Sequence, residues 1–545
     1  MRIGFFDLSS EKKAKRFTAI FFLFLTLIGL VAGFDYGLNF DALTEQKILR
    51  TTVLEYAHYF LGENHPFVQE QHEMGYLRLT DTPEIDHGQS AYYLAVPLLK
   101  LGKYGFGQLR AAWQAYTWLW FMAGVWAIYA FMREMGSSRP AAYAGSLLLY
   151  LAPRFFAEGH YNSKDVILLV LMLLTVWQGL RFLKKTCYWR GLLFSFLGAM
   201  AANLRLPGMT AWIFVGVGAL ILRFGRRDWS LRMAGIALCT VVSFIGFFVL
   251  LTPALWRDPL GYFQYLITHS SSFSRWSGAV LFQGELFIQP QMPLPRYYVL
   301  YLMLVTLPVY TLPLAIIGQA ATFRDMLRLK TAFFRDERKV MMSMTTLLWL
   351  VPLLYAILGR PVLYNSWRHF YFLYAGVVLQ GAYGIEWLFK WLKEKGSRRL
   401  LAGVLAFGFV CSGAGIIGNH PFQYGYYNFF AGRHLETQME LDYWHVSTVN
   451  ALRKLLEMRE EEEYPLYITG SDESTMVGLM EAGKFSDLKE TTFITYDSQA
   501  PYYFLNTTSA LGMDVKPPQG YRVLFTIESY GNILSTMYEK IPELP

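Results

Sequence analysis

Charged residues are scarce in this chain. Asp, Glu, Lys and Arg make up only 17% of its 545 residues, whereas hydrophobic residues make up 54% and aromatic residues 17%. A soluble domain usually has about a quarter of its residues charged. The composition therefore excludes an ordinary soluble enzyme and is typical of a polytopic membrane protein.

Cysteine is scarcer still, and no internal repeat or low-complexity tract is present. The three cysteines, at positions 187, 239 and 411, lie far apart and mostly within apolar segments. This spacing excludes a disulfide framework and a cysteine-based zinc site. The net charge of +8 could suggest nucleic acid, but the basic residues fall in short clusters between apolar runs. Membrane topology explains such clusters better, so we expect no nucleic acid partner.

Long apolar runs, in contrast, are abundant. A membrane-spanning helix needs roughly 20 apolar residues, and about eleven segments meet that criterion. The first is long and is followed by polar residues with no small-residue cleavage site, which indicates a retained helix rather than a signal peptide. The eleven predicted spans begin near Phe17, Leu109, Ala141, Val166, Gly191, Met209, Leu231, Tyr297, Val340, Phe370 and Leu400.

Basic clusters assign the two faces of the membrane. Counting spans places all six clusters on one face, which is therefore predicted to be cytoplasmic. They are "EKKAKR", "MREMGSSR", "RFLKKTCYWR", "RFGRRDWSLR", "RDMLRLKTAFFRDERK" and "KWLKEKGSRR". The protein is then predicted to span the plasma (inner) membrane, with its N-terminus on the cytoplasmic side and residues 419–545 on the outer side.

Four segments are predicted to face the exterior. They are the first outer loop (35–108), the loop that holds "EGHYNSKD", the loop 256–296 and the C-terminal segment 419–545. The last is less apolar, and one helical and four strand patterns predict a small α/β domain there. The predicted fold class is a polytopic α-helical membrane protein, with residues 1–418 as its membrane region and this domain outside.

The first candidate site lies where the chain leaves the first span, in "FDYGLNFDALTEQKILR". Asp41 precedes a helical pattern, so it is a good helix N-cap. A carboxylate held at the membrane surface is also suited to act as a general base. The two interpretations are compatible, and both stay open at this point.

The second candidate is "EGHYNSKD", directly before the fourth predicted span. Glu158, His160, Asn162, Lys164 and Asp165 are denser in hydrogen-bonding groups than a solvated loop needs, although Asp165 alone is a normal helix cap. Because outer loops converge over a bundle, we expect the Asp165 carboxylate within about 10 Å of the Asp41 carboxylate. One acid would take a proton, and the other would orient a substrate or hold a divalent cation. Lys164 would pair with a donor phosphate or with a carboxylate.

The third candidate is "TDTPEIDHGQSAYYLAVPLLKLG", in which Asp86 and His87 precede an aromatic stretch interrupted by proline. The stretch is too short for a clean span and predicts a re-entrant or interfacial helix. A His beside an Asp is more often a loop hydrogen bond than a ligand.

The fourth candidate is basic. Arg368 and His369 lie outside, against the positive-inside bias, and Arg205 lies at an outer membrane boundary before Pro207. Charges at such positions are costly and indicate function. Arginine forks suit phosphate, so these residues predict a lipid phosphate as one substrate. The alternative is that each arginine extends to lipid headgroups.

Together these stretches resemble the GT-C glycosyltransferases, and more closely the bacterial relatives of protein O-mannosyltransferases and lipid A aminoarabinose transferases (glycosyltransferase family 39). "GLNFDALTEQ", "DHGQSAYYLAVPLLKLG", "PRFFAEGHYNSKD" and "SWRHFYFLY" are similar to segments of that family in order and sidedness, over roughly residues 15–420. The first departs from the family's double-acid motif, with Phe40 for Trp and Ala42 for the second acid, which leaves Asp41 as the match.

The resemblance implies a polyprenyl-phosphate sugar donor, an acceptor hydroxyl or amine, and inversion at the anomeric carbon. Asp41 and Asp165 would be catalytic. Arg368, Arg205, Lys164 and His369 would bind the donor phosphate, and Glu158, His160, Asn162, Asp86 and His87 would form the acceptor side of the site. The leaving phosphate is already a good one, so no cofactor is required and a divalent cation is optional.

A transporter or flippase for a lipid-linked or anionic substrate is the alternative class. Transporters place ionisable residues near the bilayer midplane on broken helices, often in repeated halves. Here the acids lie at span ends on one face, and no repeat is visible. A non-enzymatic scaffold explains the acidic density least well.

Overall fold

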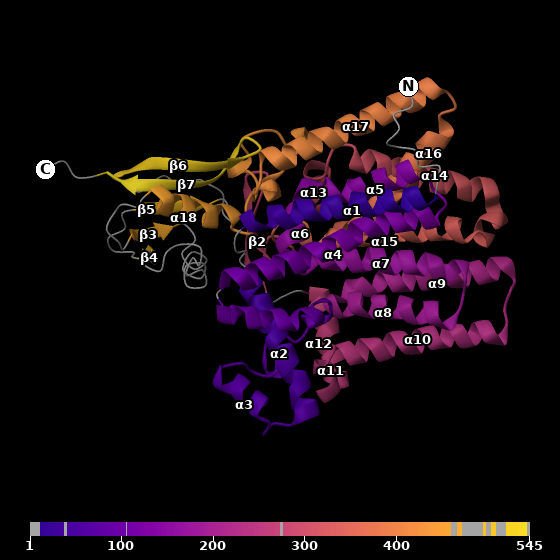
Figure 1. Ribbon diagram of the computed structural model, residues 1–545, viewed down its shortest axis with the longest axis horizontal. Helices are drawn as coiled ribbons and strands as arrows, with labels where there is room; N and C mark the ends of the chain where they lie inside the picture. The colour runs from indigo at the N-terminus through magenta and orange to yellow at the C-terminus, as the bar shows by residue number, and fades with distance from the viewer. Residues whose placement is uncertain are drawn as a thin grey trace.

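The first predicted span forms helix α1 (Glu11–Ala32), whose outward face carries large apolar side chains. The computed structural model describes residues 11–36, 41–104, 106–272, 276–458, 466–470, 494–496, 503–507 and 519–541. Its long helices run side by side, and a small sheet lies at one end of them (Figure 1). The sequence therefore yields a largely helical protein of the polytopic kind.

The helices of the N-terminal half are α2 (Ala42–Leu61), α3 (Pro66–Glu73), α4 (Phe106–Glu134), α5 (Arg139–Tyr150), α6 (Pro153–Tyr161), α7 (Asp165–Lys184), α8 (Tyr188–Leu204), α9 (Met209–Arg226), α10 (Leu231–Leu251), α11 (Ala254–Arg257) and α12 (Pro259–Ser272). Those of the C-terminal half are α13 (Tyr298–Thr306), α14 (Thr311–Leu329), α15 (Glu337–Gly359), α16 (Tyr374–Trp391), α17 (Lys395–Gly418) and α18 (Val446–Met458). Two 3-10 helices matter for the site: η3 (Ser90–Tyr104) and η6 (Arg368–Leu373).

Eight helices of the described chain are long and apolar enough to cross a membrane, and nine if one bent pair counts as a single span. These eight coincide with eight of the eleven predicted spans. The span predicted near Ala141 corresponds to α5 and α6, which are separated at Leu151 and Ala152. The span predicted near Gly191 is α8, which has 17 residues. The count of eleven therefore stays a prediction.

The bent pair, α13 and α14, shows how the bundle accommodates a break. The break lies within the span that was predicted to begin near Tyr297. The chain bends there by 113° between the two helices. The break leaves backbone carbonyls without helical partners, which is costly inside an apolar bundle. Asn428 supplies the missing donors: its side-chain Nδ2 donates to the carbonyls of Leu304 and Leu307, at 2.7 and 2.8 Å, and its backbone N–H donates to that of Val305.

Helix α7 lies at the centre of the bundle. It packs against α4, α8, α9, α15 and α16, and most of its side chains are buried. Its sequence "DVILLVLMLLTV" is apolar all round, as expected for a helix surrounded by other helices. The polar residues at its first turn are therefore fixed in position by a rigid core.

The six basic clusters gather at one end of the bundle. Ion pairs join them in sequence: Arg139 to Glu11, Lys184 to Glu134 at 3.0 Å, and Arg226 to Glu337. Arg223 also donates to Thr186, and Arg324 lies over the ring of Trp387. The clusters that were predicted to share one face of the membrane therefore lie together at one end of the molecule.

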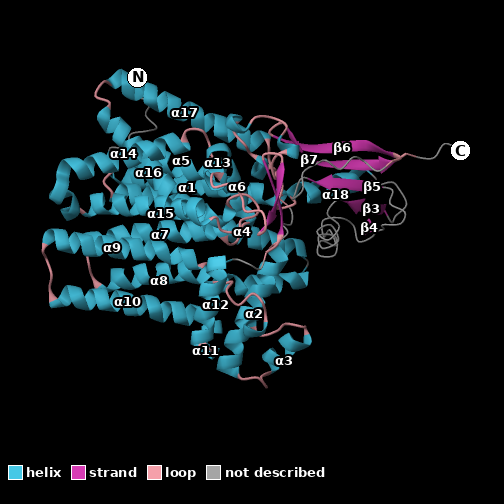
Figure 2. Cartoon of the chain, turned by 180° about the vertical axis from the view of Figure 1, so that it is seen from behind, coloured by secondary structure: helices cyan, strands magenta, loops and turns pink. Residues whose placement is uncertain are grey.

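The C-terminal sheet lies at the opposite end (Figure 2). Its strand order is β4-β3-β5-β7-β6, from β3 (Leu466–Gly470), β4 (Ile494–Tyr496), β5 (Tyr503–Thr507), β6 (Tyr521–Ser529) and β7 (Asn532–Lys540). β3 is parallel to β4 and β5, whereas β7 is antiparallel to β5 and β6. The four predicted strands and the predicted helix α18 are all present.

Three strands, β1 (Gly278–Phe282), β2 (Glu285–Gln289) and β7, were not predicted from the sequence. β7 follows β6 after the two-residue turn at Tyr530 and Gly531. β1 and β2 form a hairpin inside the predicted outer loop 256–296. The stretch that was predicted to form a re-entrant or interfacial helix instead forms the 3-10 helix η3, which contains Pro97.

Candidate functional site

Charged side chains from four separate parts of the chain meet at the end of the bundle that carries the C-terminal sheet. Asp41 precedes α2, Asp165 is the first residue of α7, Arg205 follows α8, and Arg368 begins η6. Each therefore lies at the end of a helix rather than in its middle. We call these four residues the acid–arginine cluster.

Asp41 directs its carboxylate away from its own helix. Only its backbone carbonyl takes part in helix α2, by accepting from the N–H of Glu45, and its side chain accepts no capping hydrogen bond. Its Oδ2 instead lies 3.4 Å from Nη1 of Arg368 and 3.4 Å from the hydroxyl of Tyr443. The side chain is 28% exposed, so this carboxylate is both held by a cation and open to solvent.

Asp165 is held more tightly and is buried. Its Oδ1 lies 3.0 Å from Nη2 of Arg205, and its Oδ2 lies 3.7 Å from Nη1 of Arg368. The helix cap predicted for Asp165 is supplied by Asn162, whose Oδ1 accepts from the backbone N–H groups of Lys164 and Asp165. The carboxylate of Asp165 is thereby free for the two arginines.

One nitrogen of Arg368 therefore bridges the two acids. Because Nη1 lies within 4 Å of an oxygen of each, Asp41 and Asp165 are closer together than the separation of about 10 Å that the sequence predicted. The expected proximity of the two carboxylates is confirmed, and Arg368 and Arg205 both contact Asp165. An outer cavity with these arginines on its rim stays a prediction.

The two arginines keep unused donors. Nε of Arg205 and Nε of Arg368 are buried and have no hydrogen-bond partner among the described residues. The guanidinium of Arg368 also lies over the rings of Tyr443, Trp444 and Tyr364, at 4.6, 5.4 and 5.3 Å from their centroids. Such contacts stabilise a desolvated cation. The cluster can therefore donate hydrogen bonds to a further anion.

Lys164 pairs with a carboxylate, the second of its two predicted partners. Its Nζ lies 2.6 Å from Oε1 of Glu45, whose Oε2 accepts from Gln89 at 2.9 Å. Burial acts to raise the pKa of Glu45, but the charges of Lys164 and then His87 outweigh it and lower that pKa. Glu45 therefore stays ionised and compensates Lys164.

Glu158 lies behind the cluster. Its Oε1 accepts from Nδ2 of Asn162 at 3.1 Å and from Nε1 of Trp444 at 2.9 Å. Asn162 also donates to Oδ2 of Asp165 at 3.4 Å, so Glu158 and Asp165 are linked through one amide. Glu158 and Asn162 therefore lie next to the cluster, in the region predicted from the sequence, and support Asp165.

His160 is placed in the bundle core and outside the acid–arginine cluster. It is fully buried, and its two ring nitrogens lie 3.0 and 2.9 Å from the carbonyl oxygens of Phe156 and Gly29. Its ring stacks on Trp118 at 4.2 Å and on Tyr36 at 4.6 Å. The side chain thus links α6 to α1. This role was not predicted, because His160 stands among polar residues in the sequence.

The remaining predicted residues lie around the cluster rather than in it. His369 has its ring against Tyr364, next to Arg368. His87 contacts Glu84, as a loop histidine does. The loop that contains Asp86 and His87 runs close to the end of α8, because a Cβ on Gly88 would lie 1.9 Å from the carbonyl oxygen of Asn203. This loop is therefore anchored next to Arg205.

The segment before α18 also contributes to the cluster, which was not predicted from the sequence. Tyr443 and Trp444 reach into the cluster from a part of the chain that follows the last span. Burial raises the pKa of Glu440 to about 8 and that of Asp442 to about 7. Asp442 also caps α18 by accepting from the N–H groups of Val446 and Ser447. The sequence signal for these residues is the motif "DYWHVS" (442–447), in which an acid and two aromatic residues stand directly before α18.

No group of three or more His, Cys, Asp or Glu residues with metal-binding geometry occurs within the described ranges. The acids of the cluster are paired with arginines instead. The optional divalent cation thus stays a prediction.

No model of a known protein family matches the chain, and no curated protein matches it in sequence.

Proposed function

We propose that the protein is an integral-membrane glycosyltransferase that moves a sugar from a polyprenyl-phosphate donor to an acceptor hydroxyl or amine. The observation that carries this proposal is the pair of unequal carboxylates joined by Arg368. Asp41 is 28% exposed, whereas Asp165 is 1% exposed. Two carboxyl groups in different environments are suited to different roles in one reaction.

Asp41 acts as the general base. Its carboxylate is not used as a helix cap, and it faces a hydroxyl, that of Tyr443, at 3.4 Å. In the reaction the acceptor oxygen or nitrogen attacks the anomeric carbon, and its proton passes to Asp41. The bond between that carbon and the phosphate oxygen breaks on the opposite side, so the configuration inverts.

Arg368 and Arg205 receive the leaving phosphate. Their buried Nε–H groups have no partner among the described residues and are suitable donors to phosphate oxygens. A phosphate at Arg368 would compete with Asp41 for the guanidinium, because their present contact is 3.4 Å and single-sided. Donor binding would then release Asp41 to accept a proton and would stabilise the charge that develops on the leaving group.

Asp165 positions the arginines. It is buried and contacts both of them, so it fixes two guanidinium groups relative to each other. Lys164 and Glu45 form a compensated pair on the flank of this arrangement. His369 beside Arg368 and the loop of Asp86 and His87 beside Arg205 would line the approach for the sugar and the acceptor.

The location of the cluster favours an enzyme over a transporter. Transporters hold their ionisable residues near the bilayer midplane. The four residues of the cluster all lie at helix ends, on the side of the bundle that carries the C-terminal sheet. A reaction at the membrane surface needs this placement, since the donor is a lipid and the acceptor is presented from outside.

The direct test uses purified protein and labelled polyprenyl-phosphate sugars, including hexose and pentose donors, with membrane extracts as a source of acceptor. We expect release of polyprenyl phosphate together with transfer of label to a new product. Recovery of every donor intact would contradict the proposal. Movement of intact donor across proteoliposome membranes, without cleavage, would support the transporter alternative instead.

A further inference from the structure

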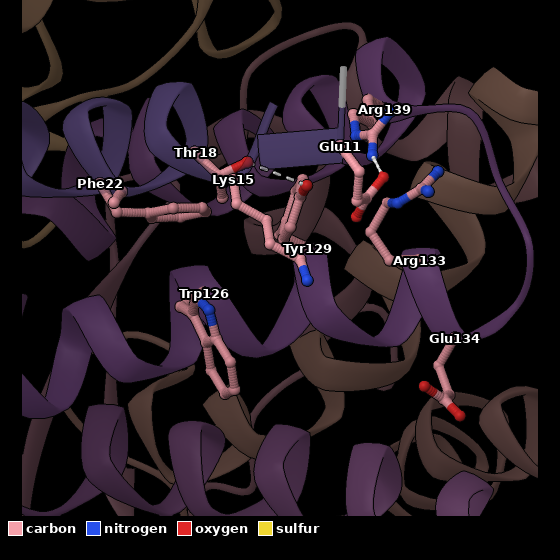
Figure 3. A pocket seen from close by; sticks show the side chains of 10 residues that line it. Glu11, Lys15, Thr18, Phe22, Trp126, Tyr129, Arg133, Glu134 and Arg139 are labelled. Carbon is pink, nitrogen blue, oxygen red and sulfur yellow. Dashed lines mark hydrogen bonds and ion pairs between the residues drawn. The ribbon is translucent and has the colours of Figure 1, made fainter. Parts of the chain in front are cut away.

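The end of the bundle opposite to the acid–arginine cluster contains a second polar site. A cavity of about 500 Å³ lies between the first turns of α1, the last turns of α4 and the start of α5. Figure 3 shows Lys15 extending from α1 and Arg133 from α4 into this space. The basic clusters gather at the same end, so the cavity opens at the predicted cytoplasmic boundary of the membrane.

The acids around this cavity are already compensated. Glu11 is paired with Arg139, and Glu134 is paired with Lys184 at 3.0 Å. Within the described residues, Arg133 donates to the carbonyl oxygen of Ser137, and neither Arg133 nor Lys15 has an ion pair of its own, although both lie near Glu11. Among the described residues around the cavity, positive charges therefore outnumber negative ones, which favours an anionic ligand.

The walls change from polar to apolar along the helix axis. At the charged end, Thr18 lies 3.2 Å from the hydroxyl of Tyr129 and 2.7 Å from that of Tyr143. Phe22 and Trp126 follow toward the middle of the bundle. The adjoining face of α1 is strongly exposed, at 64% for Ile20, 58% for Leu23 and 61% for Phe24. A ligand with a charged head and long apolar chains matches this order.

We propose that the cavity binds an anionic phospholipid of the cytoplasmic leaflet. Its phosphate lies between Lys15 and Arg133, its glycerol region contacts Thr18 and Tyr129, and its acyl chains follow α1. The cytoplasmic leaflet is the anionic one, and basic pockets between spanning helices on that side are suited to acidic headgroups. The site is separate from the acid–arginine cluster and does not depend on the reaction proposed there.

The test is native mass spectrometry of the full chain in detergent, titrated with phosphatidylglycerol or with phosphatidylcholine of the same chains. The wild-type protein should retain one phosphatidylglycerol preferentially. Lys15→Ser with Arg133→Gln should weaken that binding by at least about tenfold, because each basic residue near an anionic lipid contributes substantially. Gln keeps a donor for the carbonyl of Ser137.

The control removes one lysine and one arginine of α1 that do not line the cavity, as Lys12→Ser with Arg16→Gln. It should leave phosphatidylglycerol binding unchanged. A second variant, Ala19→Phe, keeps every charge but fills the cavity that Ala19 lines, and it should also abolish the preference. Gel filtration and thermal unfolding of each variant separate lost binding from lost folding.

Three results would overturn the proposal. They are equal losses in the pocket variant and in its control, equal retention of phosphatidylcholine and phosphatidylglycerol by the wild type, and an unchanged lipid preference in a folded Ala19→Phe protein. Glycerol 3-phosphate, which has no chains, should bind at least about tenfold more weakly than the lipid, since it lacks the apolar contacts. Equal binding of this free phosphate would also overturn the assignment to a lipid.

Discussion

Asp165 shows how a charge can be kept inside a membrane protein. It is 1% exposed and is compensated by two arginines and by the amide of Asn162. Removing one partner of a buried pair leaves an uncompensated charge, which typically costs about 3–5 kcal/mol. The stability of the cluster therefore depends on charge balance more than on any single contact.

We predict that Arg205→Met lowers the free energy of unfolding by about 3 kcal/mol. Asp165→Asn in the same chain should recover much of this loss, because the stranded charge is then gone. Unfolding in detergent, followed by circular dichroism, measures both. Arg257→Met is the control: it breaks an ion pair with Asp81 in which both side chains are more than half exposed, and it should cost less than about 1 kcal/mol. A double variant no more stable than Arg205→Met would contradict this account.

At the residue scale, the sequence predicted which charges meet but not all of their partners. Outer loops converge over a helical bundle, so Asp41, Asp165, Arg205 and Arg368 could be expected together. His160 could not be separated from its neighbours, because its role depends on the rings of Trp118 and Tyr36 from other helices.

The stability of the break between α13 and α14 depends on the side chain of Asn428. Asn428 donates to two backbone carbonyls at the break, and it is buried. Unsatisfied buried carbonyls cost about 1–3 kcal/mol each.

We predict that Asn428→Ala lowers the free energy of unfolding by roughly 2–4 kcal/mol, because two buried acceptors lose their donor. Asn450 offers a matched control. It donates to the carbonyl of Val446 from a half-buried position on α18, so Asn450→Ala should cost clearly less. Equal losses in the two variants would show that the break does not depend on Asn428.

The segment before α18 should make stability depend on pH. Burial raises the pKa of Glu440 from 4.5 to about 8. Between these values the folded protein binds a proton that the unfolded chain has released, so stability decreases as pH rises from about 4.5 to about 8. Asp442, with its pKa raised to about 7, acts in the same direction.

We predict that the unfolding temperature falls between pH 5 and pH 8 and that Glu440→Gln makes this fall shallower. The maximal contribution of one such group is about 1.4 kcal/mol for each pH unit. Glu457→Gln, which removes an exposed carboxylate of α18, is the control and should leave the slope unchanged. An identical slope in wild type and Glu440→Gln would refute the role of this carboxyl.

Among the elements, long apolar periodic segments were predictable and short ones were not. α1, α4, α7 and α10 satisfy the length criterion in both sequence and structure. The separation of α5 from α6 lies directly before Pro153, which begins α6. Proline disfavours helical backbone at the residue before it, and local hydropathy does not report this. The hairpin of β1 and β2 was missed because its ten strand residues are embedded in a long polar loop.

The two ends of the molecule differ in their charged residues. The basic clusters and the proposed lipid site occupy one end, and the acid–arginine cluster and the C-terminal sheet occupy the other (Figures 1 and 2). Charge counting predicts that the basic end is cytoplasmic.

We predict that a reporter that is active only in the cytoplasm stays silent when fused after Pro545. The same reporter inserted between α9 and α10, within the basic end, should be active. A bright signal after Pro545 would reverse the topology and, with it, the side on which the proposed reaction occurs.

The role of Asp41 as general base is tested by comparing Asp41→Asn with Asp35→Asn in a transfer assay with a labelled polyprenyl-phosphate sugar. Asp35 is a nearby outer carboxylate, 63% exposed and paired with His420 at 2.9 Å, so it controls for loss of charge alone. Asp41→Asn should reduce turnover by roughly 10²–10⁴ with folding intact, since it removes the base. Asp35→Asn should stay near wild type. Near wild-type turnover in a folded Asp41→Asn protein would contradict the assignment of Asp41 as the catalytic base.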